Sequence, residues 1–261
     1  MQEYMDFAQD IAIKAGDIML QYFKLGVSYE RKDDNTHLTI ADSTINRLVI
    51  DAVQDKYPDH SVLGEEESNS LNGSSFVWVC DPIDGTLPFV FGLTTNVFML
   101  TLVQDGVPLL GVAYDPHLNR MFNAQRGKGA FLDDKKLSVN NLEFKDSVIG
   151  CSGKKSEIVD TPQFHADIER GCHRMVFISC VVYEGMLTAA GQLGGHIYAG
   201  SNPYDGVASA LFVVEAGGRV TNLLGEQQLY NQEIKGVVAT NGVVHEQILA
   251  IAKKNYLKSS I

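Results

Sequence analysis

The segment Trp78-Val79-Cys80-Asp81-Pro82-Ile83-Asp84-Gly85-Thr86 holds two carboxylates within four residues. An apolar run, Phe76 to Cys80, leads into them and predicts a buried strand. Pro82 has no N–H group, so a regular strand ladder cannot continue through it. We therefore expect Asp81 and Asp84 to lie together where a strand ends.

Gly85 and Thr86 open the short apolar segment Leu87–Phe91. If this segment is a helical turn, its first N–H groups lack partners, and such groups attract anions. Asp81 and Asp84 repel a phosphate, but they can hold divalent cations that bridge to its oxygens. The acids also have a simpler interpretation, because Asp84 can cap a helix and Asp81 can sit in an Asp-Pro turn.

Two further segments place carboxylates at the ends of predicted elements. Gly64-Glu65-Glu66-Glu67 follows the apolar pair Val62-Leu63, which predicts the end of another strand. Pro203-Tyr204-Asp205 opens an apolar helix that closes at Gly217-Gly218. An acid in the first turn of this helix is also favoured by the macrodipole alone.

Taken together, these segments resemble the inositol monophosphatase superfamily of magnesium-dependent, lithium-sensitive phosphatases. The order and spacing of the motifs match along nearly the whole chain. The resemblance implies a layered αβαβα sandwich with a mixed, largely antiparallel first sheet and a partly parallel second sheet. It also implies hydrolysis of a phosphate monoester of a small polyol or sugar.

The composition is that of an ordinary globular protein. Of 261 residues, 45% are hydrophobic and 20% are charged, so the chain can bury a large core. The net charge of -11 disfavours nucleic acid or a membrane as a partner, because no basic stripe is present. An acidic protein that acts on phosphate esters needs cations to neutralise both partners.

The cysteines and the N-terminal residues indicate in which cellular compartment the protein is expected. Cys80, Cys151, Cys172 and Cys180 form no C-x-x-C pair and no disulfide framework. Residues 1–10 carry acids without a basic n-region, and no apolar run approaches transmembrane length. We therefore expect a cytoplasmic protein without a secretion signal.

Residues 1–144 are predicted to form an N-terminal half that carries most of the metal ligands. Apolar residues at steps of three and four predict one helix from about Tyr4 to Gly26 and another from about Asp42 to Tyr57. The segment Arg31–Thr36 is a predicted loop. An antiparallel meander is predicted with strands Val97–Val103, Val107–Tyr114, Arg120–Gln125 and Gly129–Leu132.

Residues 145–261 are predicted to form an α/β half that supplies Asp205 and the substrate pocket, and the two halves make one catalytic unit. Strands and helices alternate here, which is typical of a partly parallel sheet. The predicted elements are strands Val148–Cys151, Met175–Ser179, His196–Ala199 and Gly236–Thr240, and helices that start near Thr161, Val182, Pro203 and Val244. The fold class is α/β or α+β.

Asp42 has two competing interpretations, as the N-cap of the second helix or as an acid that faces the metal site. The segment Thr39-Ile40-Ala41-Asp42 resembles the superfamily's upstream Thr-x-x-Asp element, whose Asp helps to bind or orient metal-bound water. Lys32-Asp33-Asp34 resembles the basic loop before that element. Asp42 can cap the helix and orient a water molecule at once.

The central hexapeptide is also similar to the Asp-x-Asp-Gly-Thr start of haloacid dehalogenase-type phosphatases, which form an aspartyl phosphate. In those enzymes the acids are two positions apart, and here Ile83 stands where their nucleophile would be. The spacing excludes that mechanism. The seven histidines show no metal-binding spacing, so oxygen ligands dominate and Mg²⁺ is expected rather than Zn²⁺.

The resemblance implies a two-ion centre. Glu65, Asp81 and the backbone carbonyl of Ile83 would hold one Mg²⁺. Asp81, Asp84 and Asp205 would hold a second. Li⁺ is the inhibitor that the family implies.

The resemblance also implies which residues act on water. A weaker third ion would lie beside Glu65 and Asp42. Thr86, with Glu65 and Asp42 as further catalytic candidates, would orient and activate the attacking water without a covalent enzyme intermediate. Consecutive residues point in different directions, so at most one of Glu66 and Glu67 should reach the site, and Glu67 is expected on the surface.

The expected substrate-binding residues join the acid cluster to the segment around residue 180. They are Asp84, Gly85, Thr86, Ser179, Cys180, Tyr198 and Asp205. Family members commonly place Gly-Ser or Gly-Thr and two alanines where this chain has Ser179-Cys180-Val181-Val182. Tyr198 stands where inositol-specific members place a Glu, and Tyr204 replaces their usual Trp. These departures spare the metal ligands and argue against myo-inositol phosphate itself.

Several substrates remain open. The Pro203-Tyr204-Asp205 form also resembles histidinol-phosphate phosphatases of the superfamily, and fructose-bisphosphatases and nucleotide 3′-phosphatases share the other motifs. The alternative outside enzymes is a silent protein that binds metal or sugar phosphate. Such a protein would be expected to lose Thr86, Asp84 or Asp205, and all three are present. The expected partner is a small phosphorylated metabolite, and a homodimer is the expected assembly.

Overall fold

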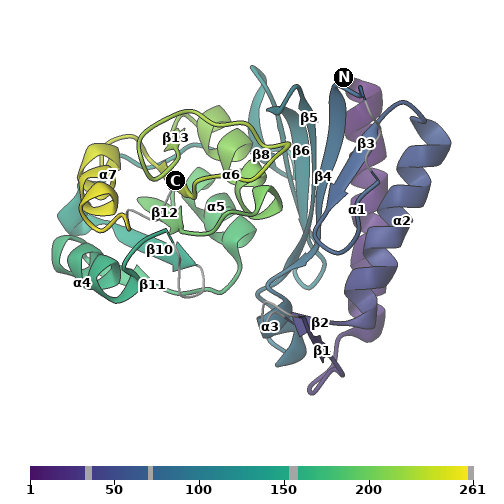
Figure 1. Ribbon diagram of the computed structural model, residues 1–261, viewed down its shortest axis with the longest axis horizontal. Coiled ribbons are helices and arrows are strands. Elements are labelled where there is room, and N and C mark those ends of the chain that lie inside the picture. The colour runs from purple at the N-terminus through teal and green to yellow at the C-terminus, as the bar shows by residue number, and fades with distance from the viewer. Residues whose placement is uncertain (33–36, 70–72, 153–157, 258–261) are drawn as a thin grey trace.

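The computed structural model describes residues 1–32, 37–69, 73–152 and 158–257. Most of the predicted loop Arg31–Thr36, with Asp33 and Asp34, lies outside the described residues. The chain forms two main sheets, with helices between them and on their outer faces (Figure 1).

The first sheet has seven strands, and their order in the sheet follows their order in the chain. The strands are β3 (Ser61–Gly64), β4 (Phe76–Asp84), β5 (Val97–Gln104), β6 (Val107–Asp115), β7 (Arg120–Gln125), β8 (Gly129–Leu132) and β9 (Lys135–Lys136). β3 and β4 are parallel, and the other neighbours are antiparallel. The predicted meander is confirmed.

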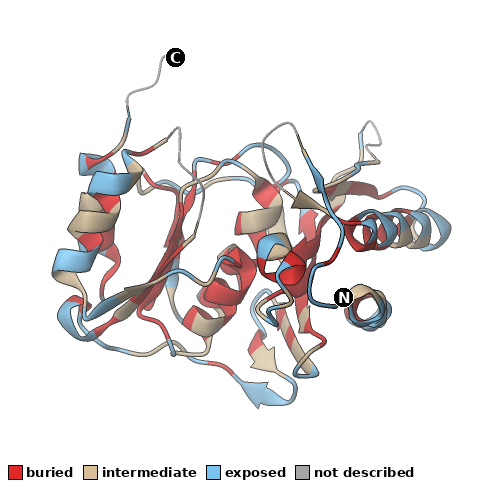
Figure 2. Cartoon of the chain, turned by 90° about the horizontal axis from the view of Figure 1, so that it is seen from below, coloured by how far each residue is buried: buried red, intermediate tan, exposed pale blue. Residues whose placement is uncertain are grey.

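The helices α1 (Gln2–Tyr22) and α2 (Ile40–Lys56) cover one face of this sheet. Each helix buries one face and exposes the opposite face. Figure 2 shows buried residues gathered in the sheets and in the helices between them. The buried stripes pack against apolar side chains of the sheet that include Trp78 and Phe98. Burial of such a stripe, more than helix propensity, stabilises helices of this kind.

The helices α5 (Val181–Ala189) and α6 (Pro203–Glu215) lie between the first sheet and a second one (Figure 1). Most of their residues are buried, because a sheet lies on either side of the pair. The second sheet contains, in spatial order, β11 (Arg174–Val176), β10 (Val148–Ser152), β12 (Gly195–Tyr198), β14 (Val237–Thr240) and β13 (Arg219–Thr221). β10 is parallel to β11 and β12, and the remaining pairs are antiparallel.

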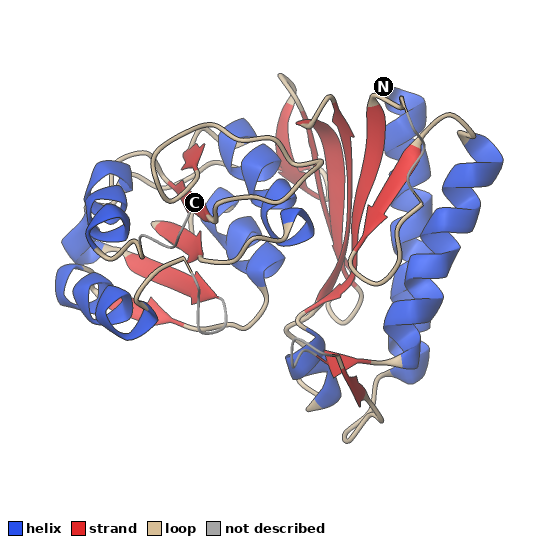
Figure 3. Ribbon diagram, in the orientation of Figure 1, coloured by secondary structure: helices blue, strands red, loops and turns tan. Residues whose placement is uncertain are grey.

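The helices α4 (Thr161–Gly171) and α7 (His245–Lys254) complete the molecule on the far side of the second sheet. Their buried side chains, such as Phe164 and Ile248, form a separate core with that sheet. The layers therefore alternate as helices, sheet, helices, sheet and helices (Figure 3). This confirms the predicted αβαβα sandwich. No helix in the described ranges is long and apolar enough to cross a membrane.

Some short elements were not predicted. They are β1 (Glu30–Arg31), β2 (His37–Leu38), the 3-10 turn η1 (Phe144–Asp146), β9 and β13. The short helix α3 (Thr86–Val90) is the predicted turn after the central acids. The predicted strand Met175–Ser179 was too long, because β11 ends at Val176 and Ser179 adopts a left-handed φ of 60°.

Candidate metal centre

A β-bulge at the end of β4 brings its two acids to one side of the strand. Asp81 pairs with Met99 and Asp84 with Val97, so the three-residue step on β4 faces a two-residue step on β5. Without the extra residue, positions three apart would point to opposite faces. The strand therefore continues through Pro82 to Asp84, which the sequence did not predict, but its ladder is irregular at the predicted place.

Asp205 joins these acids from the other half of the chain. It is the third residue of α6, and one carboxylate oxygen from each of Asp81, Asp84 and Asp205 lies within 4.8 Å of the other two. The Tyr198 hydroxyl donates to Asp205, and the Asn202 amide donates at 3.4 Å. Gly200 makes room for this tyrosine, because a Cβ there would lie 2.2 Å from the hydroxyl.

Asp81 and Asp84 are buried, Asp205 is partly exposed, and no basic side chain in the described part of the chain pairs with them. Burial, followed by repulsion from Asp84 and Glu65, raises the pKa of Asp205 to about 8. Burial and the neighbouring Glu65 also raise the pKa of Asp81 well above its usual range. Among the described residues, no Lys or Arg pairs with any of the three acids. The buried Oδ1 of Asp81 has no hydrogen-bond partner among these residues.

This donor set fits hard divalent cations. All three side chains offer oxygens, which Mg²⁺ and Ca²⁺ prefer, and none offers nitrogen or sulfur. Buried carboxylates that repel one another need either protons or cations, and an orphaned oxygen offers a free ligand position. The chemistry of the three carboxylates therefore suits a hard divalent cation such as Mg²⁺.

Glu65 and Glu66 lie beside the acid cluster, and the side chain of Lys32 pairs with both. The Lys32 ammonium lies 3.2 Å from Glu65 Oε1 and 2.5 Å from Glu66 Oε1. Burial, followed by repulsion from Glu65, raises the pKa of Glu66 to about 7. Glu67 is 58% exposed and approaches Arg47 at 3.5 Å, so it lies on the surface as expected.

Asp42 caps α2, but from a position other than the predicted one. The N-cap is Thr39, whose hydroxyl accepts from the Asp42 N–H, while the Thr39 N–H donates to Asp42 Oδ2 at 2.7 Å. This reciprocal pair is a capping box, with Asp42 as its third helical residue. Burial raises the pKa of Asp42 to about 6, and Oδ1 has no partner among the described residues. Oδ1 is thus available to another ligand.

Thr86 follows the bulge at the first position of α3. Its hydroxyl donates to the carbonyl of Ile83 at 3.1 Å, so the lone pairs of the hydroxyl oxygen are left to accept. Gly85 turns the chain with a φ of 88°, and a Cβ there would lie 2.7 Å from the Thr95 carbonyl. Only glycine fits this turn without strain.

The first turn of α5 holds Asp84 directly, which the sequence did not reveal. The Cys180 thiol donates to Asp84 Oδ2 at 2.7 Å, and the N–H groups of Val181 and Val182 donate to its two oxygens at 3.1 and 2.7 Å. Cys180 was predicted to bind substrate, whereas its side chain contacts a metal-ligand candidate. The free N–H groups of a helix start are the only signal that could have indicated this contact.

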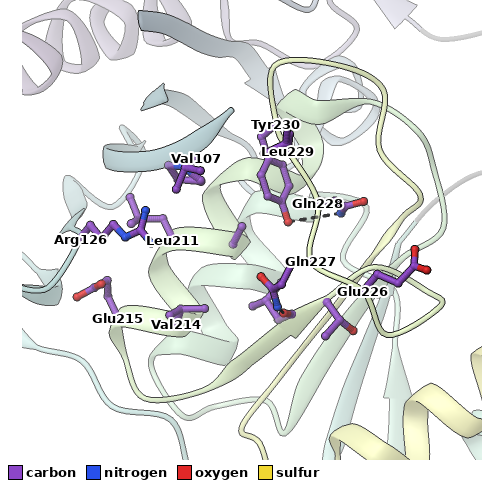
Figure 4. Close-up of a pocket in the computed structure, with 14 residues that line it drawn as sticks. Val107, Arg126, Leu211, Val214, Glu215, Glu226, Gln227, Gln228, Leu229 and Tyr230 are labelled. Carbon is purple, nitrogen blue, oxygen red and sulfur yellow. Dashed lines mark hydrogen bonds between the residues drawn. The ribbon is translucent and has the colours of Figure 1, made fainter. Parts of the chain in front are cut away.

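A pocket of about 350 Å³ lies elsewhere, beside the second half of α6. Its lining includes Val107, Arg126, Leu211, Val214 and Gln228, and Figure 4 shows the Gln228 amide on the Tyr230 hydroxyl. None of the predicted site residues lines it. The chemistry of the acid cluster, and not the size of a cavity, therefore marks the candidate centre.

The fold and the acid cluster are those expected of a phosphatase, and comparison with known proteins gives the family. The model of the inositol monophosphatase family matches residues 1–256. The chain belongs to this family, whose members hydrolyse phosphate monoesters.

Relatives along nearly the full length bear different names. A Thermotoga maritima fructose-1,6-bisphosphatase/inositol-1-monophosphatase is 26% identical, with 96% of each chain covered. A Chlorobaculum parvum histidinol-phosphatase is 30% identical over 94% of this chain and 95% of its own.

Solved structures share the fold. The Thermotoga maritima IMPase superposes with a TM-score of 0.87 at 25% identity, with 97% of each chain covered. An IMPase/NADP phosphatase complexed with Mg²⁺ and phosphate has a TM-score of 0.86 at 23% identity, with 99% of each chain covered.

Proposed function

We propose that this protein hydrolyses a phosphate monoester of a small polyol or sugar in a Mg²⁺-dependent reaction. The observation that carries the proposal is the convergence of Asp81, Asp84 and Asp205, because one carboxylate oxygen from each lies within 4.8 Å of the other two. Membership of the inositol monophosphatase family supports the reaction class. The Mg²⁺ in a neighbour of the same fold supports the choice of metal.

Five groups are proposed to hold two ions. Glu65, Asp81 and the carbonyl of Ile83 would hold one, and Asp81, Asp84 and Asp205 the other. When bound, Mg²⁺ would neutralise the phosphate, lower the pKa of water and stabilise the leaving oxygen. A third ion beside Glu65 and Asp42 is part of the proposal, because Asp42 Oδ1 is unpartnered among the described residues.

The protein is proposed to orient and deprotonate the attacking water. The Thr86 hydroxyl donates its hydrogen bond to the Ile83 carbonyl, so its oxygen is left to accept a hydrogen bond from that water and thereby orient it. Glu65 and Asp42 are the carboxylates proposed to take up the proton. The water oxygen forms the new bond to phosphorus, the ester oxygen leaves with a proton from solvent, and no bond to the enzyme forms.

The substrate is proposed to lie between Gly85, Thr86, Asp84, Asp205 and the start of α5. Ser179, Cys180 and Tyr198 complete the proposed pocket, although the hydroxyl of Tyr198 already donates to Asp205. Because the Tyr198 hydroxyl is already used on Asp205, this side chain binds a hydroxyl group of a substrate more weakly than a carboxylate would. A phosphate ester with fewer hydroxyls than inositol is therefore the preferred class.

Release of inorganic phosphate from a generic monoester, with and without millimolar Mg²⁺, tests the reaction. We expect turnover that EDTA removes and added Mg²⁺ restores. An absence of release across a broad panel of monoesters would favour the silent binding protein instead.

Histidinol phosphate is a second candidate substrate. The Chlorobaculum parvum relative named histidinol-phosphatase and the Pro203-Tyr204-Asp205 motif favour it. Catalytic efficiency should be compared across histidinol phosphate, inositol 1-phosphate, fructose 1,6-bisphosphate and a nucleotide 3′-phosphate. The substrate with the highest kcat/KM decides between the two candidates.

Lithium inhibition, a homodimer and a cytoplasmic location belong to the same proposal. Family membership supports the lithium inhibition and the homodimer, and the cysteine usage supports the cytoplasmic location. Inhibition of turnover by millimolar LiCl and a dimer mass in light scattering are the expected results.

A further inference from the structure

Asp84 is oriented by the opposite half of the molecule. Both oxygens of this β4 carboxylate accept from the beginning of α5, namely from the thiol of Cys180 and the N–H groups of Val181 and Val182. The donors lie about a hundred positions further along the chain. The direction of Asp84 therefore depends on the placement of the turn that precedes α5.

That turn has a conformation that its sequence does not favour. Ser179 adopts a φ of 60°, in the left-handed region where glycine is the usual residue. Cys180 then returns to an extended φ of -148° as the N-cap of α5. Cys180 makes no side-chain cap to its own helix, because its thiol is used on Asp84. A contact from elsewhere must hold the turn.

Glu184 supplies this contact. It lies in the first turn of α5, is fully buried, and reaches back so that Oε1 accepts the N–H of Ile178 at 3.0 Å. The carboxyl lies against β10, where a Cβ on Gly150 would come within 3.0 Å of its Cδ. The arrangement is a longer version of a capping box, with the bond made two residues before the N-cap.

We infer that Glu184 is a positioning residue for Asp84, which it serves by fixing the turn Ile178–Cys180. The inference rests on the proposed role of Asp84 as a metal ligand. The role requires an acceptor of the right length and not a charge. Burial raises the pKa of Glu184 to about 8 and so favours the neutral acid, whose carbonyl oxygen can accept from the Ile178 N–H.

Three substitutions of Glu184 distinguish the length and acceptor of its side chain from its charge. Glu184→Gln keeps the length and the acceptor, Glu184→Met keeps the length without the acceptor, and Glu184→Asp keeps the acid but is one methylene too short. Thr188→Val is the matched control. It removes another buried polar group of α5, which contacts the Glu184 carbonyl and His196 but not the turn.

Mg²⁺ affinity, measured by calorimetry, is the main readout, and the Mg²⁺ concentration for half-maximal activity is the second. We expect Glu184→Met and Glu184→Asp to weaken Mg²⁺ binding about ten-fold or more, as for other groups that orient a metal ligand. Glu184→Gln and Thr188→Val should stay within about two-fold of wild type, even where the melting temperature falls. If Glu184→Met does not fold, Glu184→Asp carries the test.

The outcomes are distinguishable. Wild-type Mg²⁺ affinity in folded Glu184→Met and Glu184→Asp would overturn the inference, as would equal weakening in Glu184→Gln or Thr188→Val. A wild-type protein that binds no Mg²⁺ would instead overturn the proposed function, and the inference with it.

Discussion

Asp81 is the side chain on which the proposed centre depends most. It is the only one assigned to both principal ions, and it combines burial with an oxygen that has no partner among the described residues. Its environment disfavours the charged form unless cations are present. An acid kept in such a place is explained by binding and not by stability.

Asp81→Asn should lower kcat by more than about 100-fold at saturating Mg²⁺, because a shared ligand supports the arrangement of both ions. Without Mg²⁺ the variant should be at least as stable as wild type, since one repelling acid is gone. Steady-state phosphate release and thermal unfolding check both points. Glu67→Gln, on the exposed neighbour of Glu66, is the control and should leave the rate unchanged. A near wild-type rate for Asp81→Asn would contradict the ligand assignment.

Thr86→Ala should reduce kcat on the order of 100-fold while Mg²⁺ affinity and KM change little, because only the group that directs the water is lost. Thr86→Ser keeps the hydroxyl and should retain most of the activity. Single-turnover hydrolysis in ¹⁸O-water should place the label in the released phosphate. An acyl phosphate trapped on Asp81 or Asp84 by rapid quench would instead show a covalent route.

Helix starts perform much of the positioning in this molecule. α2 begins with the capping box that holds Asp42, α5 begins with the donors to Asp84, and α6 begins with Asp205 itself. Free N–H groups at helix starts favour nearby acids, and the macrodipole adds to the effect. The three helices thus deliver or orient acids at one place while their remaining turns form the core.

Thr39→Ala should destabilise the protein by about 1 to 2 kcal/mol, because the N-cap is lost and buried Asp42 loses a donor. For a chain of this size the melting temperature should fall by roughly 2 to 4 °C per kcal/mol. Thr39→Ser should retain the cap. Thr44→Ala, which changes an exposed hydroxyl on the same helix, is the control. Equal melting temperatures for the Thr39 and Thr44 variants would argue against the capping box.

At the scale of the whole molecule, the proposed centre draws its ligands from both halves of the chain. Glu65 directly follows β3, β4 supplies Asp81 and Asp84, and α6 supplies Asp205. Cations at the centre would therefore link the first sheet to the layer of α5 and α6. The stability of the fold and the occupancy of the site should be coupled for this reason.

Added Mg²⁺ should raise the melting temperature. At a concentration of 100 times Kd, ligand linkage contributes about 2.7 kcal/mol, which amounts to several degrees in a chain of this size. Thermal unfolding across a Mg²⁺ titration checks this expectation, with EDTA as the reference and KCl at matched ionic strength as the control. A melting curve that does not move across millimolar Mg²⁺ would contradict a built-in metal site.

His196 should make the fold sensitive to acid. It is fully buried between Ser209 and Thr188, and burial lowers its pKa to about 3. The unfolded chain takes up a proton near pH 6.5 while the folded chain does not, so stability is present above pH 6.5 and is lost as the pH falls. The loss from this group should reach roughly 2 kcal/mol at pH 5.

Denaturant unfolding at pH 7 and pH 5, in saturating Mg²⁺, measures this loss. His196→Asn should remove most of it, whereas substitution of the half-exposed His165 should not. Identical pH dependence for wild type and His196→Asn would show that another group is responsible.

The regular elements could be predicted because each depends on neighbours in sequence. The apolar steps of α1 and the turn signals of the meander set their local structure. β13 and β9 escaped prediction, since strands of two or three residues carry too little periodicity. β11 was predicted too long, because a buried carboxyl six residues away takes the N–H of Ile178.

The family and the layered fold could be recognised from motifs and their spacings along the chain, and the same motifs predict a metal with oxygen ligands. How the acids meet depends on tertiary contacts. The bulge turns Asp81 and Asp84 to one side of the strand. The start of α5 donates three hydrogen bonds to Asp84 from residues 96 to 98 positions away. Contacts over such separations depend on how two sheets enclose a helix pair, and no local pattern in the sequence encodes that geometry.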